Sequence, residues 1–270
     1  PFEPAPPSRP VLAPDGPAGE QPASRADSPL AGGTLTDQAV SLVYTSGHWS
    51  SAPNASLYGT EAGVNPLFRS GWWYRVVGVD TREYPFPPPD SEVYGADGRL
   101  VATWNNVDGK GFAARETTWV FDEEGPSGGF TSEVFVSWGT NPAPHEIALF
   151  HLLDVDVAGS FSGDSATLRG PGYVKFTDGG STVRYRGYGA QLHYLVAPYD
   201  NLYGGDVKRR LNDGLVDDFG DTGLPFGPGD VTAGLQFRAY TPYGLARVSV
   251  GNNQARDYVR GQDYQLAPGP

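Results

Sequence analysis

The sequence predicts an all-β fold, and its composition and its turns both indicate this. Glycine (37 residues) and proline (25 residues) are abundant, and helix interiors tolerate neither well. Aromatic residues make up 13% of the chain, which is typical of strands because planar side chains pack well on a pleated surface. Asp-Gly pairs such as Asp97-Gly98 and Asp108-Gly109 separate apolar segments, and such pairs supply the positive φ of hairpin turns. We therefore expect an antiparallel β-sandwich or a jelly-roll-like domain.

The first half of the chain reads as short strands joined by turns. Apolar and polar residues alternate in 117–121 and in 130–138, which is the pattern of a half-buried strand. The two Asp-Gly turns lie between neighbouring strands and predict hairpins. We expect strands at 40–44, 72–79, 93–94, 100–105, 112–114, 115–121 and 130–138.

The second half continues with strands and contains at most one short helix. The apolar segment 147–157 has a spacing compatible with either element, and the Asp-Val alternation at its end favours a strand. Asp206 can cap a helix over 206–219 in which Val207, Leu211 and Leu215 share one face, although Gly214 weakens it. Further strands are expected at 173–176, 182–188, 190–197, 231–240 and 245–250.

The segment Gly71-Trp72-Trp73-Tyr74-Arg75-Val76-Val77 is the most aromatic stretch of the chain. In a strand, Trp72, Tyr74 and Val76 point to one face, and Trp73, Arg75 and Val77 point to the other. We interpret it as a central strand with an aromatic core face, and the alternative is that one indole serves as a stacking platform for a sugar. In the core-strand interpretation Arg75 must find a partner for its charge.

The two ends of the chain differ in composition from the middle. Residues 1–33 are rich in Pro, Ala and Gly, and such a stretch favours an extended arm that cannot build a core of its own. We expect this arm to pack on its own domain or on a neighbouring chain. Residues 34–260 then form a single β-sandwich domain, and residues 261–270 form a tail.

The charge of the chain argues against two classes of partner. A formal charge of -12 and a pI near 4.6 argue against nucleic acid and anionic membrane surfaces, which need a basic face. No apolar run approaches the length needed to cross a bilayer.

Without Cys or Met and with Pro at position 1, the chain resembles the processed product of a secreted precursor, so we expect a secreted, extracellular or cell-surface location.

Clustered aspartates raise the question of a Ca²⁺ site. One group is Asp154 and Asp156 with Asp164. The other, which we favour because nearby glycines let its carboxylates converge, comprises Asp213, Asp217, Asp218 and Asp221. Both are rich in the oxygen ligands that Ca²⁺ requires, but neither has the spacing of a twelve-residue calcium loop. Solvated turn and cap carboxylates are the alternative explanation for each group, so no cofactor is required.

No catalytic motif stands out in the sequence. There is no nucleophile elbow, phosphate loop or dinucleotide fingerprint, and the four histidines lack zinc spacing. Glu116, Glu133 and Glu146 lie on expected strands, where a carboxylate pair could cleave a glycosidic bond. A chain with so many acidic residues will have glutamates on its strands whether or not it cleaves glycans, so these three residues do not indicate an enzyme. We therefore expect a protein that is not an enzyme.

Aromatic residues in loops are the strongest candidates for a recognition surface. Tyr and Trp suit both sugar stacking and protein interfaces. Two loops that we expect to be exposed carry such rings, with Tyr84 and Phe86 in the first and Tyr199 and Tyr203 in the second. With Trp72, Trp73 and Arg75, these are the candidate ligand or interface residues.

The block Phe68-Arg69-Ser70-Gly71-Trp72-Trp73-Tyr74-Arg75-Val76 resembles a W-W-aromatic-R-V segment of uncharacterised secreted bacterial proteins. The resemblance covers about a tenth of the chain. It implies export from a bacterium and assigns no role to any residue.

Three functions follow from these observations. The leading hypothesis is a secreted, non-enzymatic structural subunit of an extracellular or cell-surface assembly, a homo-oligomer or a complex with another surface protein, in which the arm packs on a neighbouring chain. The second is a carbohydrate-binding or glycan-cleaving β-sandwich that uses exposed Trp and Tyr. The third is a viral coat component.

Overall fold

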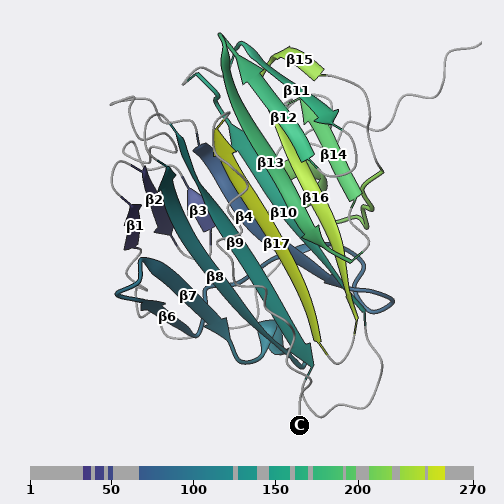
Figure 1. Ribbon diagram of the computed structural model, residues 1–270. Coiled ribbons are helices and arrows are strands. Elements are labelled where there is room, and N and C mark those ends of the chain that lie inside the picture. Colours follow the sequence, from purple (N-terminus) through teal and green to yellow (C-terminus); the bar gives the residue numbers. More distant parts are fainter. Residues whose placement is uncertain are drawn as a thin grey trace, which may run out of the picture. The chain divides into compact units, whose positions relative to one another are not determined.

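Two antiparallel sheets contain nearly all of the regular structure in the computed structural model (Figure 1). The structure describes residues 33–37, 40–45, 48–50, 67–123, 127–138, 146–158, 162–169, 173–190, 193–198, 207–220, 226–240 and 243–252. The predicted arm, apart from Gly33, and the predicted tail lie outside these residues, as do Tyr199, Tyr203 and Asp221. Every strand pairing in the described part is antiparallel, so the predicted all-β fold of packed antiparallel sheets is confirmed.

The eight-stranded sheet contains the aromatic segment near its centre. β4 is flanked by β3 on one side and by β10 on the other, and β10 continues the sheet to β16. Its strands, in sheet order, are β1 (Gly33–Asp37), β2 (Val40–Thr45), β3 (His48–Ser50), β4 (Leu67–Val76), β10 (Glu146–Val155), β16 (Val231–Tyr240) and β14 (His193–Pro198), with β5 (Tyr84–Pro85) beside β4.

The nine-stranded sheet is built largely from hairpins between successive strands. Gly98, with φ of 74°, turns the β6–β7 hairpin, and Gly179 and Gly180 turn the β12–β13 hairpin, so these predicted turns are confirmed. The strands, in sheet order, are β15 (Phe226–Gly229), β11 (Asp164–Arg169), β12 (Tyr173–Asp178), β13 (Ser181–Gly189), β17 (Tyr243–Asn252), β9 (Ser127–Trp138), β8 (Phe112–Glu123), β7 (Arg99–Trp104) and β6 (Ser91–Tyr94). A single 3₁₀ turn, η1 (Val107–Gly109), joins β7 to β8.

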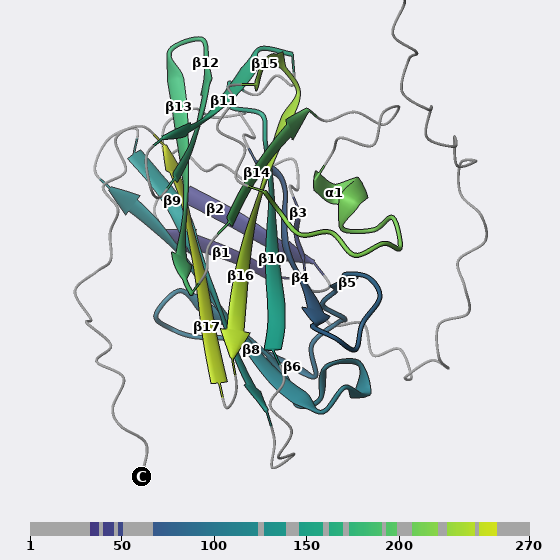
Figure 2. The ribbon, with the colours of Figure 1, turned by 90° about the vertical axis from the view of Figure 1, so that its right-hand side faces the viewer.

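The main core lies between the two sheets, which Figure 2 shows edge-on. Alternation along β4 places Trp72, Tyr74 and Val76 in this core, together with Phe130 of β9 and Tyr185 of β13 from the facing sheet. Trp73 instead packs in a second apolar cluster on the outer face of the eight-stranded sheet. The predicted division of the aromatic segment between two faces is therefore correct, and both faces are buried.

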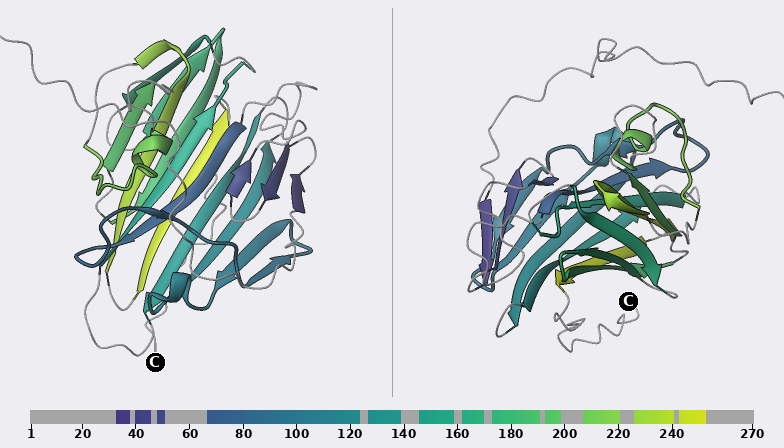
Figure 3. Two further views of the ribbon diagram at one scale, coloured as in Figure 1. Left: turned by 180° about the vertical axis from the view of Figure 1, so that it is seen from behind. Right: turned by 90° about the horizontal axis from the view of Figure 1, so that it is seen from above.

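A short helix and the segment after it cover that outer face. α1 (Val207–Arg210) is a single turn, and Val207, Leu211 and Phe219 pack against Phe150 of β10, among others. Figure 3 shows α1 over the eight-stranded sheet in the view from behind. The predicted helix over 206–219 is wrong beyond its first turn. Gly214 takes a positive φ of 81°, and Leu215 is 52% exposed instead of sharing the buried face.

No helix in the described ranges combines the length and the apolar character that crossing a bilayer would require.

Candidate functional site

The outer face of the nine-stranded sheet gathers basic and aromatic side chains from six strands. Along these strands one set of side chains is buried and the alternate set is partly open, so the open set points away from the core. We call this surface the arginine face. It comprises Arg99 of β7, Arg115 and Trp119 of β8, Phe135 of β9, Arg247, Tyr243 and Leu245 of β17, Arg184, Arg186 and Tyr188 of β13, and Tyr173 and Lys175 of β12, with Glu133 of β9 as its acidic member.

Strand register brings the side chains of this face into rows. The central row joins Arg99, Trp119, Thr131, Ser249, Arg186, Tyr173 and, on β11, Arg169. Neighbouring strands lie about 4.8 Å apart, so six steps carry this row over roughly 29 Å. Direct cross-strand neighbours are close enough to interact. The face is therefore a continuous surface and not a set of isolated residues.

Cation–π contacts hold several of these cations over aromatic rings. The guanidinium of Arg99 lies 5.2 Å from the ring centroid of Trp119, and that of Arg186 lies 5.4 Å from the centroid of Tyr173. Arg115 is similarly placed 5.9 Å from the Phe135 ring. Such contacts limit the conformations of a long side chain. The arginines are therefore partly ordered before any partner arrives.

Charge on the arginine face runs against the charge of the chain. It carries Lys175 and five arginines, and Arg169 extends its central row, whereas the chain as a whole has 19 basic and 31 acidic residues. Among the residues of this face whose side chains the structure describes, Glu133 is the acidic one, and it pairs with Arg247 through Nε at 2.8 Å. The face therefore presents a local excess of positive charge on an acidic protein.

An apolar corner adjoins the cations. Tyr243 is 52% exposed and Leu245 is 40% exposed, and the Tyr243 ring stacks on Phe135 with centroids 6.1 Å apart. Tyr and Leu in this setting offer apolar contact area next to donor groups. The arrangement can bind a ligand that combines negative charge with flat apolar surfaces.

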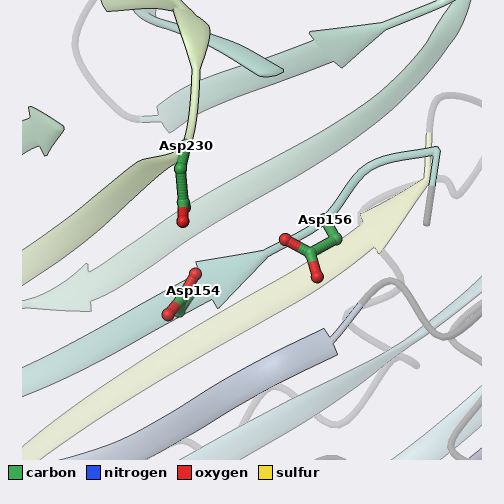
Figure 4. Close-up of side chains that lie close together, drawn as sticks. All are labelled: Asp154, Asp156 and Asp230. Carbon is green, nitrogen blue, oxygen red and sulfur yellow. The ribbon is translucent and has the colours of Figure 1, made fainter. Parts of the chain in front are cut away.

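Three acidic side chains meet at the far end of β10 (Figure 4). Asp154 belongs to β10, Asp156 follows that strand, and Asp230 lies between β15 and β16. One ligand oxygen from each lies within 4.8 Å of the others. Burial raises the pKa of Asp156. The sequence had placed Asp154 and Asp156 together, but Asp230 is brought to them only by the fold.

The predicted aspartate group at 213–221 does not converge in the described part of the chain. The Asp213 carboxylate accepts a hydrogen bond from the Leu215 backbone, and Oδ1 of Asp218 accepts hydrogen bonds from Arg75 and Gln236 at 2.6 Å each. These bonds keep the pKa of Asp218 below its usual value even though partial burial opposes this. Asp217 instead donates its backbone N–H to Glu83. The carboxylates of Asp213 and Asp218 therefore bind different partners, the first within its own turn and the second on β4 and β16.

Arg75 has the partner that the sequence required. Its Nη1 donates to Oε1 of Glu83 at 2.6 Å, its Nη2 donates to Asp218, and its guanidinium lies 5.7 Å from the Phe150 ring centroid. Burial raises the pKa of Glu83, although the hydrogen bond from Asp217 and the charge of Arg75 act in the opposite direction. The predicted candidate Arg75 is therefore engaged inside the protein.

Three predicted recognition aromatics are also enclosed. Trp72 and Trp73 are each 1% exposed, which leaves neither indole face open to a sugar. Phe86 is buried against Tyr74 and Trp104, so the expectation of an exposed loop is wrong for this residue. The prolines keep this segment extended, and the extended backbone turns Phe86 inward beside β4. Tyr84 is half-buried and lies under Lys110 and Arg82.

A buried Ser–His pair, which the sequence analysis did not detect, lies in the main core. Ser70 Oγ lies 2.9 Å from Nε2 of His151, and Nδ1 lies 2.7 Å from the Tyr185 hydroxyl. Tyr185 donates its one proton to the backbone oxygen of His151, so Nδ1 carries a proton and Nε2 accepts from Ser70. Burial lowers the pKa of His151 to about 3. All three side chains are fully enclosed, so the pair is structural.

The three glutamates proposed for glycan cleavage do not face a common space. Glu116 is buried in the core, where its Oε1 accepts from Ser132. Glu133 lies on the opposite face of the same sheet, and Glu146 begins β10 in the other sheet, where it pairs with Arg238. A glycosidase needs two carboxyl groups flanking one bond. These residues do not provide such a pair.

A scan against protein-family models and a search of curated proteins each found no match to this chain.

Proposed function

We propose that this chain is a non-enzymatic β-sandwich subunit of a secreted or cell-surface assembly, and that it binds an acidic glycan of that surface through the arginine face. The observation that carries the proposal is the concentration of arginines and aromatic rings on one sheet face of a chain with a formal charge of -12. Positive charge gathered on one face in this way costs self-repulsion and finds its use in a partner of opposite sign.

The chemistry of the face favours carboxylate or sulfate groups carried on sugar rings. Guanidinium presents a planar fork of donors that matches a carboxylate in a bidentate fashion. Trp119, Tyr173 and Tyr188 lie in the same or adjacent rows and offer apolar area for sugar rings. An extended acidic oligosaccharide can therefore contact several strands at once.

The charge of the remaining chain favours a glycan over nucleic acid. Duplex DNA carries one charge per roughly 1.7 Å, and so dense a polyanion is repelled by the acidic remainder of the chain. A uronate-containing glycan spaces its charges more widely. The arginine face can attract it while the repulsion from the other surfaces stays small.

The binding experiment compares one double variant with a charge-matched control. Arg184→Ala/Arg186→Ala removes two cations of the arginine face, and Arg82→Ala/Arg210→Ala removes two cations outside the nine-stranded sheet. The probes are an alginate oligosaccharide, a chondroitin sulfate oligosaccharide, a neutral xylo-oligosaccharide and a short poly-dT strand, titrated by calorimetry at low and moderate salt.

We expect binding of one or both acidic glycans, loss of about tenfold or more in affinity in the first variant, and little change in the control. Affinity should fall as salt rises. Equal loss in both variants, preference for the neutral glycan, or binding of poly-dT alone would each overturn the proposal.

The assembly part of the proposal rests on the sequence. The Pro-rich arm over 1–33 cannot bury a core by itself, and a neighbouring chain is one surface on which it can pack. Deleting 1–33 should lower the number of chains per particle, as measured by light scattering. An unchanged number of chains would leave a binding module without the assembly role.

A further inference from the structure

The acidic cluster at the end of β10 has a fourth carboxylate close by. Asp164, the first residue of β11, is fully buried, and its Oδ1 accepts a hydrogen bond from the Val157 backbone at 3.1 Å. Its other oxygen, Oδ2, is buried with no hydrogen-bond partner in the described structure. A buried carboxylate oxygen without a donor is costly and points to a missing ligand.

Two neighbours place Asp164 beside the cluster. Val157, which holds Oδ1, is the residue after Asp156. Across the sheet, Asp164 pairs with Gly229, the residue before Asp230. Asp164 is therefore a neighbour of two members of the cluster, one through Val157 and the other through Gly229.

We propose that Asp154, Asp156, Asp164 and Asp230 bind one Ca²⁺ ion. The donor set consists of carboxylate oxygens from three separate segments, and Ca²⁺ accepts six to eight such ligands in flexible geometry. Zn²⁺ would call for His or Cys, and neither is among these residues. Mg²⁺ keeps most of its water and seldom uses more than one or two carboxylates.

Arg69 of β4 is one cation beside the cluster. Arg69 of β4 lies opposite Asp154 in the register and can neutralise one carboxylate. Arg69 lies on the β4 side of the cluster. Asp164, which belongs to β11, and Asp230, which follows β15, lie on the other side. A divalent ion in the cluster would offset more of its negative charge than a single guanidinium can.

The ion would fasten the two sheets together at one end. Asp154 belongs to the eight-stranded sheet, Asp164 belongs to the nine-stranded sheet, and Asp230 lies where the chain passes from β15 in one sheet to β16 in the other. A bound Ca²⁺ ion would therefore hold the connection between β15 and β16 against the end of β10 and the start of β11. This role is independent of the arginine face, whose members lie on the outer surface.

The experiment titrates CaCl₂ into the full chain after removal of metal with EDTA. Calorimetry should show one ion per chain with a Kd on the order of 10⁻⁴ to 10⁻³ M, as in extracellular modules. At tenfold excess over Kd, we expect the Tm to rise by about 3–6 °C, and Mg²⁺ should produce a smaller rise. No heat and no Tm shift at about 10 mM Ca²⁺ would overturn the proposal.

Two neutral variants test the ligands, and one matched variant controls for the loss of charge. Asp156→Asn and Asp230→Asn should each abolish the Ca²⁺-dependent rise in Tm. Without Ca²⁺, both should have a Tm equal to or above that of the parent, because like charges are removed. Asp213→Asn, in the other aspartate group, should respond to Ca²⁺ like the parent chain. A full Ca²⁺ response in the two cluster variants, or its loss in Asp213→Asn, would contradict the assignment.

Discussion

Arg75 donates a hydrogen bond from Nη1 to Oε1 of Glu83 over 2.6 Å, and the two side chains are 5% and 0% exposed. Glu83 also accepts from the backbone of Asp217, and Arg75 also contacts the Asp218 side chain. This ion pair therefore joins the central strand β4, the segment before β5 and the segment after α1. Such a pair matters most when one partner is removed, because the other charge is then left inside the protein.

Replacing Glu83 with Gln should lower the free energy of unfolding by about 3 kcal/mol, at the low end of the range for broken buried pairs because Asp218 still contacts Arg75. Urea denaturation of the variant and the parent measures this loss. The control is Asp97→Ala, which removes the exposed partner of Arg99 and should cost less than about 1 kcal/mol. Equal losses in the two variants would show that the buried ion pair contributes no more to the free energy of unfolding than the exposed one does.

The contribution of His151 to stability should fall on mild acidification. Its pKa is lowered by burial from 6.5 to about 3, so only the unfolded chain takes up a proton between these values. The contribution is complete above pH 6.5 and is lost as the pH falls toward the folded pKa. From pH 7 to pH 5.5 we expect this contribution to fall by about 1 kcal/mol. Asp164 acts in the opposite direction, because burial raises its pKa from 3.8 to about 7 and the folded chain therefore takes up that proton before the unfolded chain does.

The measurement is urea unfolding of the parent and of His151→Gln across that pH range. The variant begins from a lower stability, and the His151 part of its pH slope should disappear. An identical slope in both proteins would mean that the imidazole does not titrate differently on unfolding.

Phe86→Ala should destabilise the fold by about 3–5 kcal/mol, because the ring fills the core between Tyr74 and Trp104. Val79→Ala is the control, since Val79 is 62% exposed in the turn after β4 and should change stability by less than about 0.5 kcal/mol. Thermal or urea unfolding distinguishes the two. A loss below about 1 kcal/mol for Phe86→Ala would restore the sequence-based expectation that this aromatic is exposed.

Glu133→Gln should strengthen binding of an acidic glycan by a few-fold, because it removes the acid of the arginine face and releases Arg247. Most of the gain should be in the association rate and should shrink at high salt. Glu146→Gln makes the same change in net charge beside Arg238 in the other sheet and should leave affinity unchanged. Surface plasmon resonance with an immobilised alginate oligosaccharide measures both. An equal gain in both variants would indicate a general charge effect.

Local patterns in the sequence predicted much of the fold. Alternation placed Trp72 and Trp73 on opposite faces of one strand, and the Asp97-Gly98 turn fixed a hairpin, because both depend on residues adjacent in the chain. The strands β11 and β15 were missed because they are short, with six and four residues. The helix over 206–219 was predicted from a three-residue apolar pattern, which packing against Phe150 overrode after one turn.

Neither candidate site could be assembled from the sequence. The arginine face draws on residues from Arg99 to Arg247, and only strand register shows that Arg186 and Arg99 belong to one row. Asp230 lies more than seventy positions beyond Asp156, so proximity between them depends on where β16 enters the sheet.

The sequence by itself determined the all-β class, the acidic balance and the two faces of the aromatic strand, because turn residues, composition and side-chain alternation are local properties. Only the tertiary structure decided that both faces of that strand are covered, that Arg75 finds Glu83, and that cations gather on one sheet. Pairing between distant strands sets these features, and their register is fixed by the burial of whole faces instead of by any single segment.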